Sequence, residues 1–135
     1  MKKTLLVMQC ACSLIRRILG DLLGGWDGIL YALFLFIAVE YMTGIFVAIV
    51  NKNLFNKVIF CEIAKKLSII LLVAVGHVVD TQIMQNENIV RVMIIFFYLS
   101  SEGISILENV ALLGLPVPQK LRYILEQLKD ENSME

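Results

Sequence analysis

Residues 28–50 read GILYALFLFIAVEYMTGIFVAIV, an apolar stretch that is interrupted only by Glu40 and Thr43. As a helix it rises about 34 Å, at about 1.5 Å per residue, which is enough to cross the hydrocarbon core of a bilayer. The polar residues 51–53 follow it directly. The stretch therefore predicts a transmembrane helix, and it decides the fold class.

The composition of the whole chain also favours a membrane protein. Of the 135 residues, 59% are hydrophobic and 18% are charged, whereas soluble domains have about 45–50% and about 25%. A chain of this length cannot bury the excess, because small domains bury only roughly 60–70% of their unfolded surface. Its net charge of zero removes the argument for a nucleic-acid partner. We expect one all-α integral membrane domain that is surrounded by lipid.

A second span is expected at residues 55–80, although its apolar run is shorter. Lys57, Lys65 and Lys66 lie in its first half, and their long side chains are expected to extend back to the interface. Glu62 stands one helical turn before Lys66 and is expected to pair with it. A re-entrant hairpin is the alternative interpretation of this segment.

Amphipathic helices are expected at both ends of the chain. Residues 4–23 place polar side chains, including Arg16 and Arg17, on one stripe and apolar side chains on the other. A transmembrane position would cost roughly 2.5–3.5 kcal/mol for each arginine, so we expect this helix to lie in the interface. Trp26 then falls at the level of the lipid headgroups. Residues 116–135 repeat apolar residues at helical spacing and predict an amphipathic tail.

The basic residues indicate how the chain is oriented. With a third span at residues 89–115, the region 51–66 and the tail share one side and hold seven Lys and Arg, against four in the N-terminal arm and none in the loop 80–88. The positive-inside rule then places the N-terminus outside and the C-terminus inside the cell membrane. A fourth span formed by the arm fits this rule better, but only by burying two arginines. The basic residues expected at the cytoplasmic side of the second span are Lys52, Lys57, Lys65 and Lys66.

No catalytic or metal-binding motif is present in the sequence. Cys10, Cys12 and Cys61 lack the spacing of metal ligands, and His77 is the one histidine. We therefore expect neither enzyme activity nor a cofactor or metal. His77 is expected to be packed and hydrogen-bonded rather than to act as a pH switch.

Polar residues at membrane depth mark a pathway or a helix interface. Glu40 lies near the middle of the first span, and the third span carries a polar stripe that begins at Arg91. These faces either line a lumen or an oligomer interface, or pack inside the chain, where Glu40 would be protonated and the stripe would face Glu40, Lys66 or His77. We predict pore-lining or interface roles for Glu40, Thr43, Gly44, Tyr98, Glu102, Ser105, Glu108 and Asn109.

Several motifs together resemble a known family. They are EYMTG at 40–44, SILEN at 105–109 and GLPVP at 114–118, with Lys65-Lys66 and Asp80 at the two ends of the second span. Over about residues 26–130 the chain resembles the toxin-secretion/phage-lysis holin family. The resemblance implies a homo-oligomer in the cytoplasmic membrane, which opens lesions for a phage endolysin or a protein toxin. Gly114, Pro116 and Pro118 are predicted to form a hinge after the third span.

Two other functions fit a short helical bundle with an acidic residue at membrane depth. One is a small proton-coupled multidrug transporter, in which Glu40 would bind both proton and cation. The other is a passive membrane anchor whose tail binds a partner. The transporter requires four good spans and does not explain the Pro-Val-Pro hinge or the amphipathic tail, and the family resemblance favours the holin.

Overall fold

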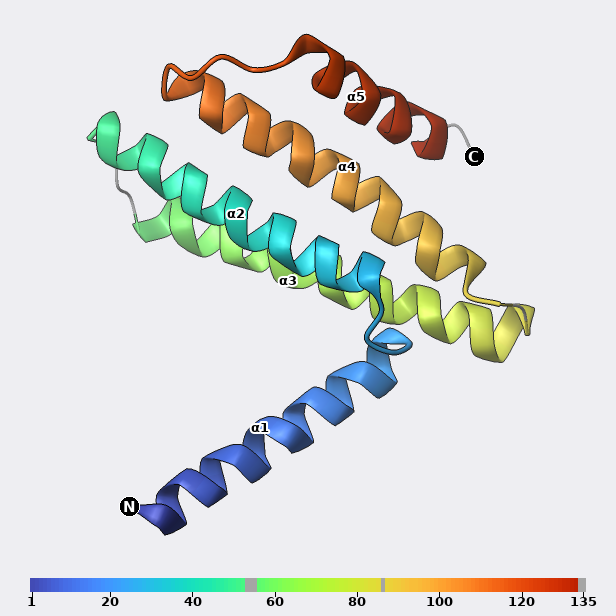
Figure 1. The fold of residues 1–135 in the computed structure, drawn as a ribbon. Helices are drawn as coiled ribbons and strands as arrows, with labels where there is room; N and C mark the ends of the chain where they lie inside the picture. The colour runs from blue at the N-terminus through green and yellow to red at the C-terminus, as the bar shows by residue number, and fades with distance from the viewer. Residues whose placement is uncertain (53–55, 86, 134–135) are drawn as a thin grey trace.

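The computed structural model describes residues 1–52, 56–85 and 87–133, and all the secondary structure in these residues is helical (Figure 1). This confirms the all-α prediction for the described part of the chain. The elements are α1 (Lys2–Leu23), α2 (Gly28–Val50), α3 (Asn56–Val78), the π-helical segment η1 (Val79–Met84), α4 (Ile89–Leu112) and α5 (Gln119–Ser133).

Two of the described helices, α2 and α4, are long and apolar enough to cross a membrane. In their most apolar stretches only 11% of α2 and 28% of α4 is buried inside the protein. The core helix of a soluble protein would be mostly buried. The exposed apolar surfaces of both helices are therefore suited to contact with lipid.

The expected second span corresponds to α3 and the beginning of η1. The helix α3 is as long as α2, at 23 residues, but among the described helices it is not apolar enough to count as a candidate span, because Glu62, Lys65 and Lys66 lie in its first half. The expected end of the helix at residue 80 was wrong, since helical structure continues through η1 to Met84. Asp80 does not terminate the helix because it turns inward and is fully buried.

The helix α4 occupies the centre of the fold and packs against α2, α3 and α5. Two glycines permit the close approach of these helices. A Cβ at Gly76 would lie 2.8 Å from Ile94 Cδ1, and one at Gly103 would lie 3.0 Å from Leu125 Cδ1 and 3.3 Å from Phe36 Cε2. Larger residues at either position would force the helices apart.

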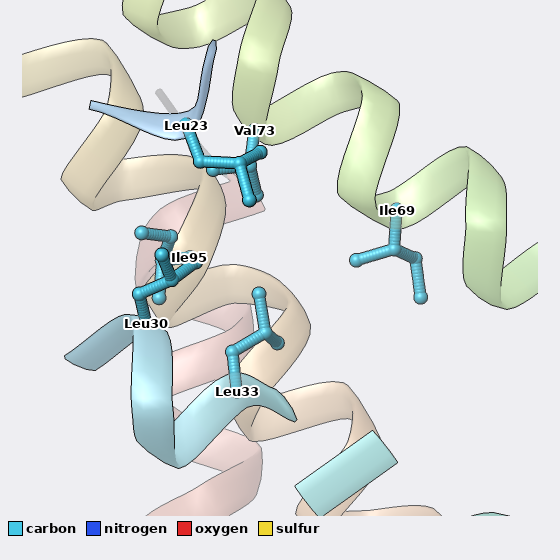
Figure 2. Close-up of a cluster of buried hydrophobic side chains, with 6 residues drawn as sticks. All are labelled: Leu23, Leu30, Leu33, Ile69, Val73 and Ile95. Carbon is cyan, nitrogen blue, oxygen red and sulfur yellow. The ribbon is translucent and has the colours of Figure 1, made fainter. Parts of the chain in front are cut away.

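The hydrophobic core is small and lies near the beginning of α2. Figure 2 shows its six buried side chains, which come from the end of α1 and from α2, α3 and α4. They are Leu23, Leu30, Leu33, Ile69, Val73 and Ile95. Many other large apolar side chains are exposed, including Phe60 at 73% and Leu71 at 65%. The chain alone therefore leaves much of its apolar surface uncovered.

After α4 the chain reverses, and α5 lies alongside α4 (Figure 1). Gly114 adopts a φ of 92° in this reversal, a conformation that glycine adopts without steric cost. The sequence predicted a separate tail helix from residue 116, whereas the helix begins at Gln119 and returns along α4. Gly103 permits this packing, because its missing side chain leaves room for Leu125.

Candidate functional site

Three ionisable side chains from three helices meet near the middle of the bundle. The Lys66 ammonium lies 2.8 Å from Glu40 Oε2, and it donates hydrogen bonds to the two Glu102 carboxylate oxygens over 2.7 and 2.8 Å. The three side chains are 14%, 13% and 5% exposed, respectively. We refer to Glu40, Lys66 and Glu102 as the ion cluster, and it joins α3 to both α2 and α4.

The ion cluster corrects two expectations for Lys66. The sequence predicted that Lys66 would extend to the interface and pair with Glu62, but Glu62 lies beside Lys65 instead, at 3.9 Å. Lys66 turns inward because two carboxylates are available there, and a charge pair is stronger in a low-dielectric interior than in water. Glu40 is correspondingly not an isolated carboxyl group.

A second polar contact joins α2 to α4 close to the ion cluster. The Asn109 amide donates to Thr43 Oγ1 over 3.0 Å and to the Glu40 carbonyl over 3.3 Å. The Thr43 hydroxyl can in turn donate to the Val39 carbonyl at 2.9 Å. A Cβ at Gly44 would lie 3.7 Å from the Asn109 amide nitrogen, so this residue borders the same contact. The structure thus brings together Glu40, Thr43, Gly44 and Asn109 as neighbours.

The rest of the predicted polar stripe on α4 divides into two groups. Tyr98 and Ser105 line a groove of about 490 Å³ together with the ion cluster. Glu108 is exposed and does not line this groove. The stripe therefore does not line a single groove, because Tyr98 and Ser105 face the ion cluster whereas Glu108 is exposed outside it.

The predicted basic residues are also separated from one another. Lys52 and Lys65 are exposed, whereas Lys66 lies inside the ion cluster. The side chain of Lys57 lies outside the described residues, as does Asn53 in the polar stretch that follows α2. Two lysines adjacent in sequence, Lys65 and Lys66, thus have opposite surroundings.

Arg91 forms a second buried charge site, which the sequence analysis did not identify. Its side chain is fully buried, and it donates to Asp27 Oδ2 over 2.8 Å, to the Gly25 carbonyl over 3.0 Å and to the Leu23 carbonyl. These contacts attach the first turn of α4 to the connection between α1 and α2. The signal in the sequence was an arginine in an apolar helix with Asp27 and Asp80 at neighbouring helix ends.

Asp80 completes this site from the other side of Arg91. Its two carboxylate oxygens accept hydrogen bonds from the backbone amides of Val90 and Arg91, each over 2.9 Å. Asp80 thereby satisfies two of the free amides at the beginning of α4. The guanidinium of Arg91, hydrogen-bonded to Asp27, holds the pKa of the Asp27 carboxyl group below its ordinary value of 3.8.

His77 approaches the same connection but lacks the expected hydrogen bond. Its Nδ1 is buried and has no hydrogen-bond partner among the described residues. A Cβ at Gly24 would lie 2.8 Å from this nitrogen and 2.7 Å from Arg91 Nε. Gly24 also has a φ of 88°, so both the space and the backbone require glycine there.

Comparisons with known proteins place these residues in a family. The model of the bacteriophage holin family matches residues 17–130, which contain the ion cluster and Arg91 with its partners. An uncharacterized protein of Clostridium perfringens is 36% identical over 111 residues, which cover 82% of each chain. An uncharacterized protein of Listeria monocytogenes is 39% identical over 108 residues, which cover 80% of this chain and 76% of the relative.

A more distant relative has a functional name. The protein named "Probable holin" of Bacillus phage phi105 is 28% identical over 94 residues, which cover 70% of this chain and 69% of the relative. No solved structure matches the chain. Because the family model matches residues 17–130, which are most of this chain, the chain belongs to the bacteriophage holin family.

Proposed function

We propose that the protein is a holin, which assembles into homo-oligomers in the cytoplasmic membrane and forms lesions that release an endolysin or a protein toxin. Family membership supports this function. The observation that carries it is the ion cluster, in which the Lys66 ammonium pairs with the carboxylates of Glu40 and Glu102 from two other helices, inside a bundle with an apolar exterior. A subunit of this kind is stable in lipid and still contains the polar groups that a lesion requires.

The ion cluster also supports α3 as a third span. A lysine at membrane depth is costly when it is alone, but pairing with carboxylates of neighbouring helices lowers that cost. Lys66 has two such partners, Glu40 and Glu102. In this arrangement α2, α3 and α4 cross the membrane, and α1 lies in the interface with its apolar side chains in the lipid.

The tail helix α5 is proposed to move to the cytoplasmic surface in the inserted protein. Beside α4 it would carry Lys120, Arg122 and Glu126 along a membrane-spanning helix, and charged residues there are unfavourable. At the surface the charges face water while its apolar residues face lipid. The hinge residues Gly114, Pro116 and Pro118 permit this movement because they interrupt the helix.

The proposed topology predicts a defined labelling pattern. In a variant without Cys10, Cys12 and Cys61, a cysteine introduced at Glu87 should react with a membrane-impermeant maleimide on intact cells. A cysteine introduced at Lys52 should react only after the cells are permeabilised, because three spans place it inside. Mass-tag electrophoresis measures both reactions. Labelling of position 52 but not of position 87 on intact cells would contradict the topology.

The transporter is not favoured as an alternative. A proton and cation carrier needs an acidic residue that its substrate can reach, whereas Glu40 is 13% exposed and is paired with Lys66. The family match also concerns holins. A passive anchor, unlike a holin, would not cause loss of membrane potential or lysis, so induced expression distinguishes the two.

Induced expression in bacteria that also produce an endolysin tests the function. A holin should cause abrupt loss of membrane potential followed by lysis, measured with a potential-sensitive dye and culture turbidity. The Glu102→Gln variant should lyse earlier, because its neutral amide binds Lys66 less strongly than the Glu102 carboxylate does. Hydrogen bonds between two charged groups are roughly twice as strong as those between neutral groups. Glu87→Gln is the matched control with the same change of charge, and it should follow the wild-type time course because Glu87 is exposed in the connection before α4 and is not among the predicted pore-lining or interface residues.

The possible contrary results have distinct meanings. A passive anchor or a transporter would leave the potential and the turbidity unchanged, which would exclude the proposed function. Equal shifts in lysis time for Glu102→Gln and Glu87→Gln would support a holin but contradict a specific role of the ion cluster.

A further inference from the structure

A pocket lies where α1 meets the rest of the bundle. Its volume is about 610 Å³, and its lining comes from one face of α1, from the connection to α2 and from His77 of α3. In Figure 1 this is the region in which α1 leaves the bundle. We refer to it as the junction pocket. It is separate from the ion cluster, which lines a different groove.

The polar groups of the junction pocket fit an anion. Arg16 and Arg17 both line it, and within the described residues neither guanidinium forms an ion pair or a hydrogen bond. Asp21 is the acidic residue of the lining, so the charged groups sum to one positive charge. His77 adds its buried, unpartnered Nδ1. Two guanidinium groups on one face are well suited to bind a phosphate.

Contacts of Trp26 and Gly20 stabilise the shape of the junction pocket. The Trp26 indole nitrogen donates to the Arg16 carbonyl over 2.9 Å, and its ring packs against Phe34 with ring centroids 5.6 Å apart. A Cβ at Gly20 would lie 2.9 Å from the same indole nitrogen, so glycine permits this contact. The connection is therefore attached to α1 at the level of Arg16.

The position of the pocket favours a lipid over a free anion. It lies next to the beginning of α2, the first helix able to cross a membrane. The opposite face of α1 exposes apolar side chains, including Ile15, Ile18 and Leu22, at 50% or more. A helix with such a face places its polar stripe at the headgroup level, where tryptophan also prefers to lie.

We propose that the junction pocket binds the headgroup of an anionic phospholipid. Arg16 and Arg17 bind the phosphate, and the Asp21 carboxylate accepts hydrogen bonds from headgroup hydroxyl groups. In the tautomer that carries its hydrogen on Nδ1, the imidazole of His77 supplies a further donor. Phosphatidylglycerol has this chemistry, because a glycerol with two free hydroxyl groups is joined to its phosphate. This binding does not depend on lesion formation.

Trp26 provides a direct measurement, because it is the one tryptophan of the chain and it lines the pocket. The full-length protein in a neutral detergent is titrated separately with short-chain phosphatidylglycerol, short-chain phosphatidylcholine and inorganic phosphate. Phosphatidylglycerol should change the Trp26 emission in a saturable way, at concentrations at which the other two probes have no effect.

Two double variants with the same change of charge test the assignment. Arg16→Gln with Arg17→Gln should weaken phosphatidylglycerol binding about tenfold or more, since it removes two charge-assisted sites for the phosphate. Lys2→Gln with Lys3→Gln lies on the same helix outside the pocket and should bind like the wild type. Circular dichroism checks that both variants remain helical.

Three results would overturn the proposal. Equal binding by the two double variants would mean that general charge attraction is responsible. A response to phosphatidylcholine as large as that to phosphatidylglycerol would exclude recognition of the headgroup. Saturation by inorganic phosphate at the same concentrations would assign the pocket to a free anion. If the arginine double variant loses its helical structure, the lipid titrations of the wild type still decide the question.

Discussion

The substitution Lys66→Met should destabilise the folded bundle by about 3–5 kcal/mol, the usual cost of removing one partner from a buried ion pair. Glu40 and Glu102 would then face each other without a cation inside the protein. Thermal unfolding in detergent, followed by circular dichroism, should show a midpoint lower by about 10–20 °C for a chain of this size. Methionine is chosen because it keeps most of the aliphatic volume of lysine.

The adjacent lysine is the matched control for Lys66. The Lys65 side chain is 73% exposed and only reaches Glu62 at 3.9 Å, so Lys65→Met should change stability by less than about 0.5 kcal/mol. Combining Lys66→Met with Glu40→Gln and Glu102→Gln should recover much of the lost stability, because no unpaired charge then remains. Equal losses at Lys65 and Lys66 would contradict a buried ion cluster.

The substitution Arg91→Met should cost about 2–3 kcal/mol, because a fully buried guanidinium leaves backbone carbonyl groups without a donor, whereas the Asp27 side chain is 46% exposed and can be solvated. Asp27 and the carbonyl groups of Leu23 and Gly25 all lose a donor. These groups hold the connection between α1 and α2 against α4. The emission of Trp26 should therefore shift to longer wavelength in this variant, in addition to the lower unfolding midpoint.

An arginine in an exposed ion pair is the control for Arg91. Arg122 is 50% exposed and pairs with Glu126 one turn away, so Arg122→Met should cost less than about 1 kcal/mol. An unchanged Trp26 emission in Arg91→Met would mean that Arg91 does not organise the connection.

Acid provides a second measurement on the contact between Arg91 and Asp27. The folded-state pKa of Asp27 lies below 3.8 because Arg91 hydrogen-bonds the carboxylate. The stabilisation is therefore fully present above the unfolded pKa, and it is lost as the pH falls through the folded pKa. In Arg91→Met this part of the acid dependence should disappear, which unfolding midpoints measured between pH 7 and the acid limit would show.

The fold class, the positions of most helices and the polar residues within the apolar helices were predictable from the sequence. The apolar stretch at 28–50 is long enough to span, and Gly24-Gly25 interrupts the helical pattern before it. These properties depend on composition and on residues close in sequence. Glu40 and Glu102 stood out because carboxyl groups within apolar helices are rare.

The sequence left the partners of these polar residues open, because packing of the third-span stripe against Glu40, Lys66 or His77 was one of two arrangements that fitted it. A helical pattern shows which residues share a face, but the element that covers the face depends on how the helices cross. Lys66 therefore appeared to be a partner of Glu62, and Arg91 appeared to belong to the same stripe as Glu102. In the structure Lys66 contacts two other helices, and Arg91 contacts the end of α1 and Asp27.

The sequence by itself thus determined an all-helical chain with segments long and apolar enough to span a membrane, because hydrophobicity and periodicity are local properties. The tertiary structure alone decided that one lysine serves two carboxylates, that Arg91 attaches α4 to the connection between α1 and α2, and that α5 returns along α4. Each of these contacts joins helices that are distant in sequence, and buried charges adopt whichever pairing the packed helices bring within hydrogen-bonding distance.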